Sequence, residues 1–77
     1  MNQDPIVSII TPCYNGENYV QRFLDSILAQ TYSSIELIII NDGSIDNTEK
    51  IVYGYKESLK TRNIKLVYIY QENKRNL

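Results

Sequence analysis

Two short runs of β-branched and other apolar residues place the strongest limit on what this chain can fold into. The first run covers residues 6–10, between Pro5 and Pro12, and the second covers residues 35–40. Apolar runs of this length, bounded by turn formers, are typical of strands covered on both faces, as in parallel sheets. The sequence therefore predicts two buried strands of a parallel sheet.

An amphipathic helix is predicted between the two runs. Apolar residues recur at the spacing i, i+3, i+4, i+7 and i+8, with polar residues on the opposite side. These apolar residues are Val20, Phe23, Leu24, Ile27 and Leu28. Before them, Asn15 and Gly16 supply a turn, and Glu17 places negative charge near the positive end of the helix dipole.

A second helix and a third strand follow. The helix is predicted from about residue 47 to residue 59, although Gly54 inside it costs roughly 1 kcal/mol relative to alanine. The strand is predicted at residues 64–70. There Leu66, Tyr68 and Tyr70 alternate with Lys65, Val67 and Ile69. Because one face of this strand is partly polar, we expect it nearer the edge of the sheet.

The expected order of elements is β-α-β-α-β, in one domain over residues 1–77. Two strands joined through a helix pack in parallel with a right-handed crossover. We expect a doubly wound α/β sheet with strand order three, two, one, the first helix on one face and the second on the other face or edge. Ligands of such sheets bind beyond the carboxyl ends of the strands, where the loops at residues 11–17, 41–46 and 71–76 converge.

Composition excludes several classes of protein. A net charge of -1, from eight basic and nine acidic side chains, leaves no basic stripe for nucleic acid. The absence of histidine removes Ser-His-Asp and Cys-His nucleophiles and most zinc sites. The apolar runs are far shorter than the roughly 20 residues of a membrane-spanning helix. The single cysteine, Cys13, forms no intramolecular disulfide, so we expect a cytoplasmic protein.

The loop after the first strand differs from a dinucleotide-binding turn. Such a turn reads G-x-G-x-x-G, so that a pyrophosphate reaches bare backbone. Residues 11–17 contain one glycine, with Tyr14 and Glu17 beside it. The ring of Tyr14 either stacks a base or packs over the strand ends. Cys13 lacks a histidine or a nearby lysine to lower its pKa, so we expect it to be inert.

Two roles are open to Asp42 at the end of the second apolar run. Its carboxylate accepts a hydrogen bond from a base N–H or a ribose hydroxyl, or it braces a turn with Gly43 and Ser44. Position alone does not choose between these roles. Asp46 and the two residues after it are expected to cap the second helix.

Four blocks of the sequence resemble family 2 glycosyltransferases in order and spacing. They read VSIITPCYNGE (residues 7–17), SILAQTY (26–32), ELIIINDGS (36–44) and DNT (46–48), and span nearly the whole chain. The resemblance implies the Rossmann-like half of a GT-A fold, a nucleoside diphosphate sugar in the crevice, and usually inversion at the anomeric carbon. It places Pro12 and Tyr14 around the base, Asp42 on the base edge and Glu17 close to the nucleoside.

The catalytic parts of that family lie downstream of this segment. They are an Asp-x-Asp motif, which holds a divalent cation (Mg²⁺ or Mn²⁺) against the diphosphate, and a carboxylate base. We therefore expect a nucleotide-binding segment that is incomplete at its C-terminal end, and assign it no catalytic residue and no metal ligand. The family's third strand is usually followed by Asn, one residue and Gly, whereas Asn73 is followed by Lys74 and Arg75.

Other functions compete with that of a glycosyltransferase segment. A phosphoacceptor receiver domain shares the order of elements, but Pro12, Cys13 and Tyr70 stand where it needs acidic residues. An inactive nucleotide-binding or oligomer-forming module remains the alternative. The apolar edge of the first strand favours pairing with a second copy or strand exchange, and thus a homo-oligomer.

The resemblance leaves the donor sugar and the acceptor open. A carboxylate that faces a ring N–H suits uracil, so a UDP-sugar is favoured, although thymine and guanine also present an N–H. The enzyme is expected in the cytoplasm or at the cytoplasmic face of the membrane.

Overall fold

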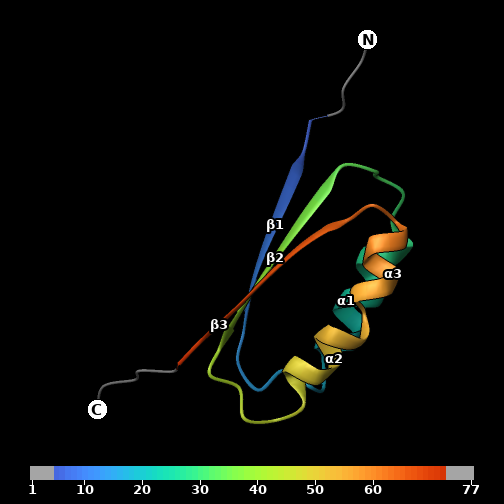
Figure 1. Cartoon of the computed structure of the whole chain (residues 1–77). Helices are drawn as coiled ribbons and strands as arrows, with labels where there is room; N and C mark the ends of the chain where they lie inside the picture. The colour runs from blue at the N-terminus through green and yellow to red at the C-terminus, as the bar shows by residue number, and fades with distance from the viewer. Residues whose placement is uncertain (1–4, 73–77) are drawn as a thin grey trace.

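A computed structural model describes residues 5–72 as a three-stranded parallel sheet with helices between its strands (Figure 1). The strands lie in the order β1-β2-β3, with β2 in the centre. This confirms the predicted β-α-β order, the parallel pairing and the strand order. The elements are β1 (Val7–Cys13), α1 (Val20–Ala29), β2 (Ile35–Asp42), α2 (Thr48–Gly54), α3 (Lys56–Thr61) and β3 (Lys65–Gln71).

The predicted second helix is two short helices that meet at Tyr55. The N–H of Tyr55 donates to the carbonyl of Val52 at 3.0 Å, a tighter turn than that of an α-helix. Gly54 ends α2, and apart from its own helix backbone and chain neighbours no atom lies within 4 Å of the position that a Cβ would take there. A glycine without packing neighbours does little to hold a helix together, so the break falls there.

Both strands that lead to the expected site run further than predicted. β1 continues through Pro12 to Cys13, and β2 continues to Asp42. Proline has no N–H to donate and is tolerated where one side of a strand is not paired. Within residues 5–72, β1 pairs with β2 alone, so Pro12 fits this position.

All three helices cover the same face of the sheet (Figure 1), so the prediction that the second helix takes the other face was wrong. Both connections step in the same direction, from β1 to β2 and from β2 to β3. Two right-handed crossovers in one direction place their helices on one side. A doubly wound arrangement requires a step in the opposite direction, which residues 5–72 do not contain.

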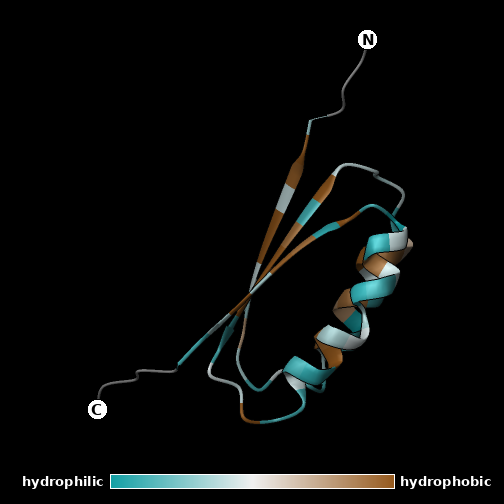
Figure 2. Ribbon diagram, in the orientation of Figure 1, coloured by the Kyte–Doolittle hydropathy of each residue, from teal (hydrophilic) through white to brown (hydrophobic). Residues whose placement is uncertain are grey.

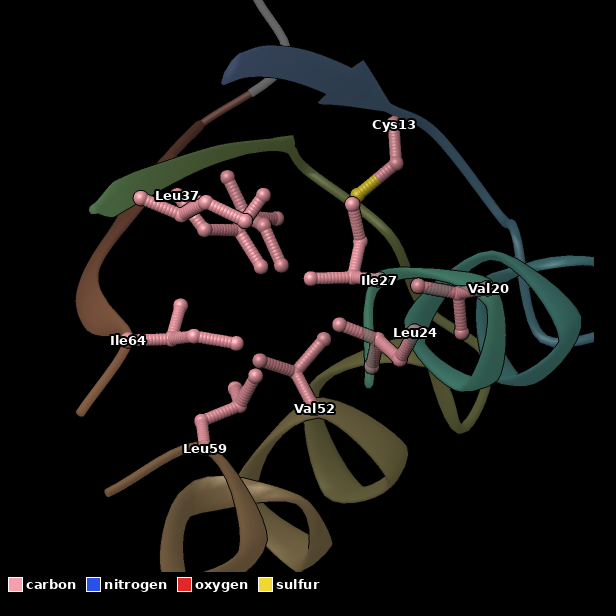
Figure 3. Packing of buried hydrophobic residues seen from close by; sticks show 10 residues of the cluster. Cys13, Val20, Leu24, Ile27, Leu37, Val52, Leu59 and Ile64 are labelled. Carbon is pink, nitrogen blue, oxygen red and sulfur yellow. The ribbon is translucent and has the colours of Figure 1, made fainter. Parts of the chain in front are cut away.

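The core lies between this face of the sheet and the helices (Figure 3). Leu37 of β2 points toward Leu24 of α1, Val52 of α2 and Leu59 of α3, and each of these four is fully buried. Full burial of such a side chain contributes about 1.5 to 3 kcal/mol.

Polar side chains also hold the helices together. The hydroxyl of Tyr55 donates to the Asp25 carboxylate of α1 at 2.5 Å. Arg62, after α3, donates to the carbonyl oxygens of Leu28 and Gln30 at the end of α1. The two bonds from Arg62 satisfy carbonyl groups that the end of a helix leaves without a partner inside the helix.

The opposite face of the sheet is apolar and partly exposed, so the prediction that the strands are covered on both faces was wrong. Ile10 of β1 and Ile69 of β3 are 61% and 43% exposed, and Ile38 and Ile40 of β2 are half-buried. The strands are largely apolar along their length, as the hydropathy colouring shows (Figure 2). No helix described between residues 5 and 72 is long and apolar enough to cross a membrane.

Candidate functional site

An open pocket of about 260 Å³ lies at the carboxyl ends of β1 and β2. It is lined by Pro12, Cys13, Tyr14, Tyr19 and Asp42. The structure therefore brings together three of the residues predicted for a nucleotide site, Pro12, Tyr14 and Asp42. A larger groove of about 460 Å³, lined in part by Lys56 and Lys60, runs between α3 and β3 and contains none of the predicted residues.

Strand register explains why these side chains meet. Pro12 lies opposite Ile40, and Cys13 lies opposite Asn41. The next residues along each strand, Tyr14 and Asp42, therefore leave the sheet side by side. Tyr14 is 46% exposed, so much of its surface is open to solvent at the pocket.

Tyr19 also lines this pocket, although it was not among the residues predicted for the site. Tyr19 precedes α1 and is 44% exposed, outside the apolar side of the helix that packs on the sheet. An exposed aromatic residue beside a predicted ligand loop was the signal available. Its ring lies over Gly16, where a Cβ would come within 2.7 Å of the ring carbon Cζ.

A turn after β2 presents the carboxylate of Asp42, and Asn41 braces that turn. The N–H of Ser44 donates to Oδ1 of Asn41 at 3.0 Å, and Gly43 has a φ of 73°, which favours glycine. Asp42 is half-buried and accepts a hydrogen bond from Nε2 of Gln71 at 3.3 Å. The turn is thus braced by Asn41, and not by Asp42 as one of its two possible roles required.

A partly buried hydrogen-bond chain fixes Asn41 in turn. Its Nδ2 donates to the hydroxyl of Tyr68 on β3 at 2.9 Å, and this hydroxyl donates to Glu49 of α2 at 3.1 Å. Burial raises the pKa of Tyr68 to about 12; the bond from Asn41 opposes this shift and the bond to Glu49 adds to it. The phenol therefore stays protonated and able to donate at neutral pH.

Glu17, the fourth predicted residue, does not line the pocket. Its carboxylate accepts a hydrogen bond from the N–H of Asn47 at 3.0 Å. Its own N–H donates to Oδ2 of Asp46 at 3.1 Å. Glu17 therefore joins the loop after β1 to the loop before α2.

Comparison with known proteins identifies the family. The model of glycosyl transferase family 2 matches residues 8–77. The chain belongs to this family. It is 51% identical over 69 residues to an uncharacterized glycosyltransferase of Rickettsia prowazekii (strain Madrid E), covering 90% of this chain and 20% of that protein. The chain thus spans about a fifth of the length of that relative.

Two further relatives carry more specific names. Glycosyltransferase GlyA of Streptococcus pneumoniae is 41% identical over 70 residues, which cover 91% of this chain and 10% of that protein. The hyaluronan synthase of Pasteurella multocida is 50% identical over 52 residues, which cover 68% of this chain and 5% of that protein.

In this family 2 chain, Asp46 stands one residue before Asn47, the N-cap of α2, and the side chain of Asn47 makes no capping hydrogen bond. Oδ1 of Asp46 accepts hydrogen bonds from the N–H and the hydroxyl of Thr48, the first residue of α2. Desolvation would raise the pKa of Asp46, but the hydrogen bonds from Thr48 and Glu17 outweigh it and hold the pKa below its ordinary value. Asp46 is thus a carboxylate with both oxygens occupied.

Cys13 of this family 2 chain is unsuited to nucleophilic chemistry. It is 3% exposed, and its side chain points toward Ile27 of α1 in the core (Figure 3). Burial, with the nearby charge of Asp46, raises the pKa of the thiol above its ordinary value. The thiol is therefore protonated at neutral pH, which agrees with the expectation of an inert side chain.

The residues described here do not fit the divalent cation that the family resemblance implies. Residues 5–72 hold no group of three or more acidic or cysteine side chains able to bind a metal ion. Both oxygens of Asp46 are engaged by hydrogen bonds, and Asp42 stands apart from it across the turn. Asn73, the residue that departs from the family pattern, lies outside the described residues.

Proposed function

We propose that this chain forms the nucleoside-binding part of a glycosyltransferase that uses a nucleoside diphosphate sugar, with UDP-sugars favoured. The observation that carries the proposal is the meeting of Pro12, Tyr14 and Asp42 in one open pocket. This pocket lies beyond the carboxyl ends of parallel strands, where ligands of α/β sheets bind. Membership of family 2 supports a sugar donor of this class.

The pocket offers both kinds of contact that a pyrimidine base requires. An aromatic ring such as that of Tyr14 stacks a base, worth about 1 to 3 kcal/mol per base in proteins that bind nucleic acids. The carboxylate of Asp42 accepts only, so it pairs with the ring N–H of uracil and not with the ring nitrogen of cytosine. Gln71, which donates to Asp42, holds the carboxylate at the edge of the pocket.

The transfer reaction itself belongs to residues beyond those described here. We assign no catalytic residue to residues 5–72 and no metal ligand, since they hold no group of three or more side chains able to bind a metal ion. A divalent cation, Mg²⁺ or Mn²⁺, would neutralise the diphosphate in the whole enzyme. A cytoplasmic location agrees with the single cysteine, since it cannot form a disulfide within the chain.

Titration of UDP and CDP into the chain tests the proposal. Loss of a charged hydrogen-bond partner costs about 1.5 to 3 kcal/mol, so Asp42→Ala should weaken UDP binding roughly ten- to a hundredfold. CDP binding should change far less. Asp42→Asn should move the preference toward CDP, because an amide can donate to the cytosine ring nitrogen.

Glu57→Ala, which removes an exposed carboxylate of α3, is the matched control and should bind both nucleotides as the wild type does. Calorimetry gives both dissociation constants, and circular dichroism verifies that the variants are folded. An equal UDP to CDP ratio in wild type and folded Asp42→Ala would refute base reading by Asp42.

A further inference from the structure

Three consecutive backbone N–H groups in the turn after β1 donate to side chains of the loop before α2 or of the first residue of α2. The N–H of Asn15 donates to Oγ of Ser44 at 2.7 Å, and that of Gly16 to Oγ1 of Thr48 at 2.8 Å. The third, that of Glu17, donates to Asp46 at 3.1 Å. Asn15 has a φ of 48°, which turns successive N–H groups toward one side.

In a dinucleotide-binding turn, N–H groups at this place in the fold bind a phosphate. Here two hydroxyls and a carboxylate of the chain itself occupy them. The negative oxygen that the turn attracts is therefore supplied from within, by Asp46. These three N–H groups are therefore not free to bind a diphosphate.

Two bonds run in the opposite direction and close the arrangement. The N–H of Ile45 donates to Oδ1 of Asn15 at 2.9 Å, and the N–H of Asn47 donates to the carboxylate of Glu17 at 3.0 Å. We call the side chains that make these contacts the loop clasp. They are Asn15, Glu17, Ser44, Asp46 and Thr48.

Residues of the loop clasp are close neighbours, along the chain, of two residues that line the nucleotide pocket. Tyr14 precedes Asn15, and Asp42 stands two residues before Ser44. Fixing Asn15 to Ser44 therefore fixes the distance between the ring and the carboxylate that line the pocket.

We propose that the loop clasp is a positioning device for the nucleotide site, which holds Tyr14 and Asp42 at the separation that a base requires. Its members act through those two residues and do not contact the nucleotide, Glu17 included. In the block of residues 42–48, Asp42 alone faces the pocket, while Ser44, Asp46 and Thr48 face the other loop. This inference rests on the proposed function.

Thr48→Val tests the loop clasp, because valine keeps the shape of threonine and removes the hydroxyl that accepts from Gly16 and donates to Asp46. UDP binding should weaken about threefold to tenfold. Thr48→Ser, which keeps the hydroxyl, should restore it. Thr61→Val, the same change at an exposed position of α3, should have no effect.

A double-mutant cycle separates positioning from a general loss of stability. In the background of Asp42→Ala, Thr48→Val should cost clearly less than in the wild type, because it acts through Asp42. Equal losses in both backgrounds, or UDP binding by folded Thr48→Val at the wild-type level, would overturn the proposal. If Thr48→Val does not fold, Ser44→Ala, which removes a half-buried hydroxyl of the loop clasp, takes its place in the cycle.

Amide hydrogen exchange by NMR provides a readout that needs no nucleotide. In Thr48→Val, exchange at Gly16 and its two neighbours should speed up together, and the resonances of Tyr14 and Asp42 should shift. Unchanged exchange and unchanged resonances would overturn the loop clasp itself. Absence of UDP binding by the wild type would instead overturn the proposed function, and the exchange data would still decide whether the clasp positions Tyr14 and Asp42.

Discussion

The hydroxyl of Tyr68 stands in the middle of a hydrogen-bond chain that reaches the candidate site. It accepts from Nδ2 of Asn41 at 2.9 Å and donates to Glu49 at 3.1 Å. Asn41 is fully buried and braces the turn that carries Asp42. Tyr68→Phe removes this one oxygen and keeps the ring, which packs against Tyr53 with 5.3 Å between ring centroids.

The expected loss of stability follows from what the substitution leaves behind. One N–H of the Asn41 amide remains buried without an acceptor, at a cost of about 1 to 3 kcal/mol. Chains of this length have free energies of unfolding of roughly 4 to 12 kcal/mol. Tyr68→Phe should therefore remove a large part of the total and lower Tm by about 10 °C.

Urea denaturation followed by circular dichroism measures this loss. Tyr70→Phe, at a half-exposed tyrosine on the same strand, is the control and should stay within about 0.5 kcal/mol of the wild type. A loss below about 0.5 kcal/mol for Tyr68→Phe would refute the assignment of a structural role to this hydroxyl.

The pH dependence gives a second check on the same hydroxyl. The pKa of Tyr68 is raised from 10.0 to about 12 in the folded chain, so the phenol stabilises the fold fully below pH 10. This contribution is lost as the pH rises through 12. Between pH 10 and 12, the free energy of unfolding of the wild type should therefore fall more steeply than that of Tyr68→Phe, which lacks the titrating hydroxyl.

Two further substitutions probe the pocket and the exposed face of the sheet. Gly16→Ala places a Cβ within 2.7 Å of the Tyr19 ring and should push this ring away from the pocket. UDP binding, measured by calorimetry, should weaken severalfold, while Tm from thermal melts changes little. Unchanged UDP binding would contradict this expectation. Ile10→Lys should reduce the self-association that the apolar face favours, whereas Ile45→Lys, in an exposed loop, should not. Light scattering at high concentration decides this, and a compact wild-type monomer would contradict it.

The sequence was sufficient to predict where the pocket lies. The two apolar runs and the helix between them predicted parallel strands, and this order alone brings the ends of β1 and β2 together. Pro12 and Asp42 follow those strands, so their meeting needed no knowledge of side-chain packing. Their role in nucleotide binding stays a prediction.

The covered face of the sheet was harder to predict. The run from Leu37 to Ile40 is apolar at each position, so its pattern predicts cover on both faces. In residues 5–72, Leu37 and Ile39 are buried under helices, while Ile38 and Ile40 face the other way. The predicted strand order, with two right-handed crossovers, already required both helices on one face, so the expectation of cover on the second face conflicted with it.

The loop clasp also escaped prediction, because its bonds join side chains to the backbone of a distant loop. A signal was nevertheless present. Ser44, Asp46 and Thr48 lie just before and at the start of the predicted second helix. Short oxygen-bearing side chains at such places commonly accept hydrogen bonds from backbone N–H groups.

The same bonds bear on how fast the protein reaches its native state. Those of the loop clasp join residues 29 to 32 positions apart. Such contacts form only after the crossover between β1 and β2 has closed, which is slow for parallel strands. We therefore expect the clasp to form late in folding, so that its loss speeds unfolding while refolding keeps its rate. The pocket of Pro12, Tyr14 and Asp42 is then expected to be completed late in folding and to open early in unfolding.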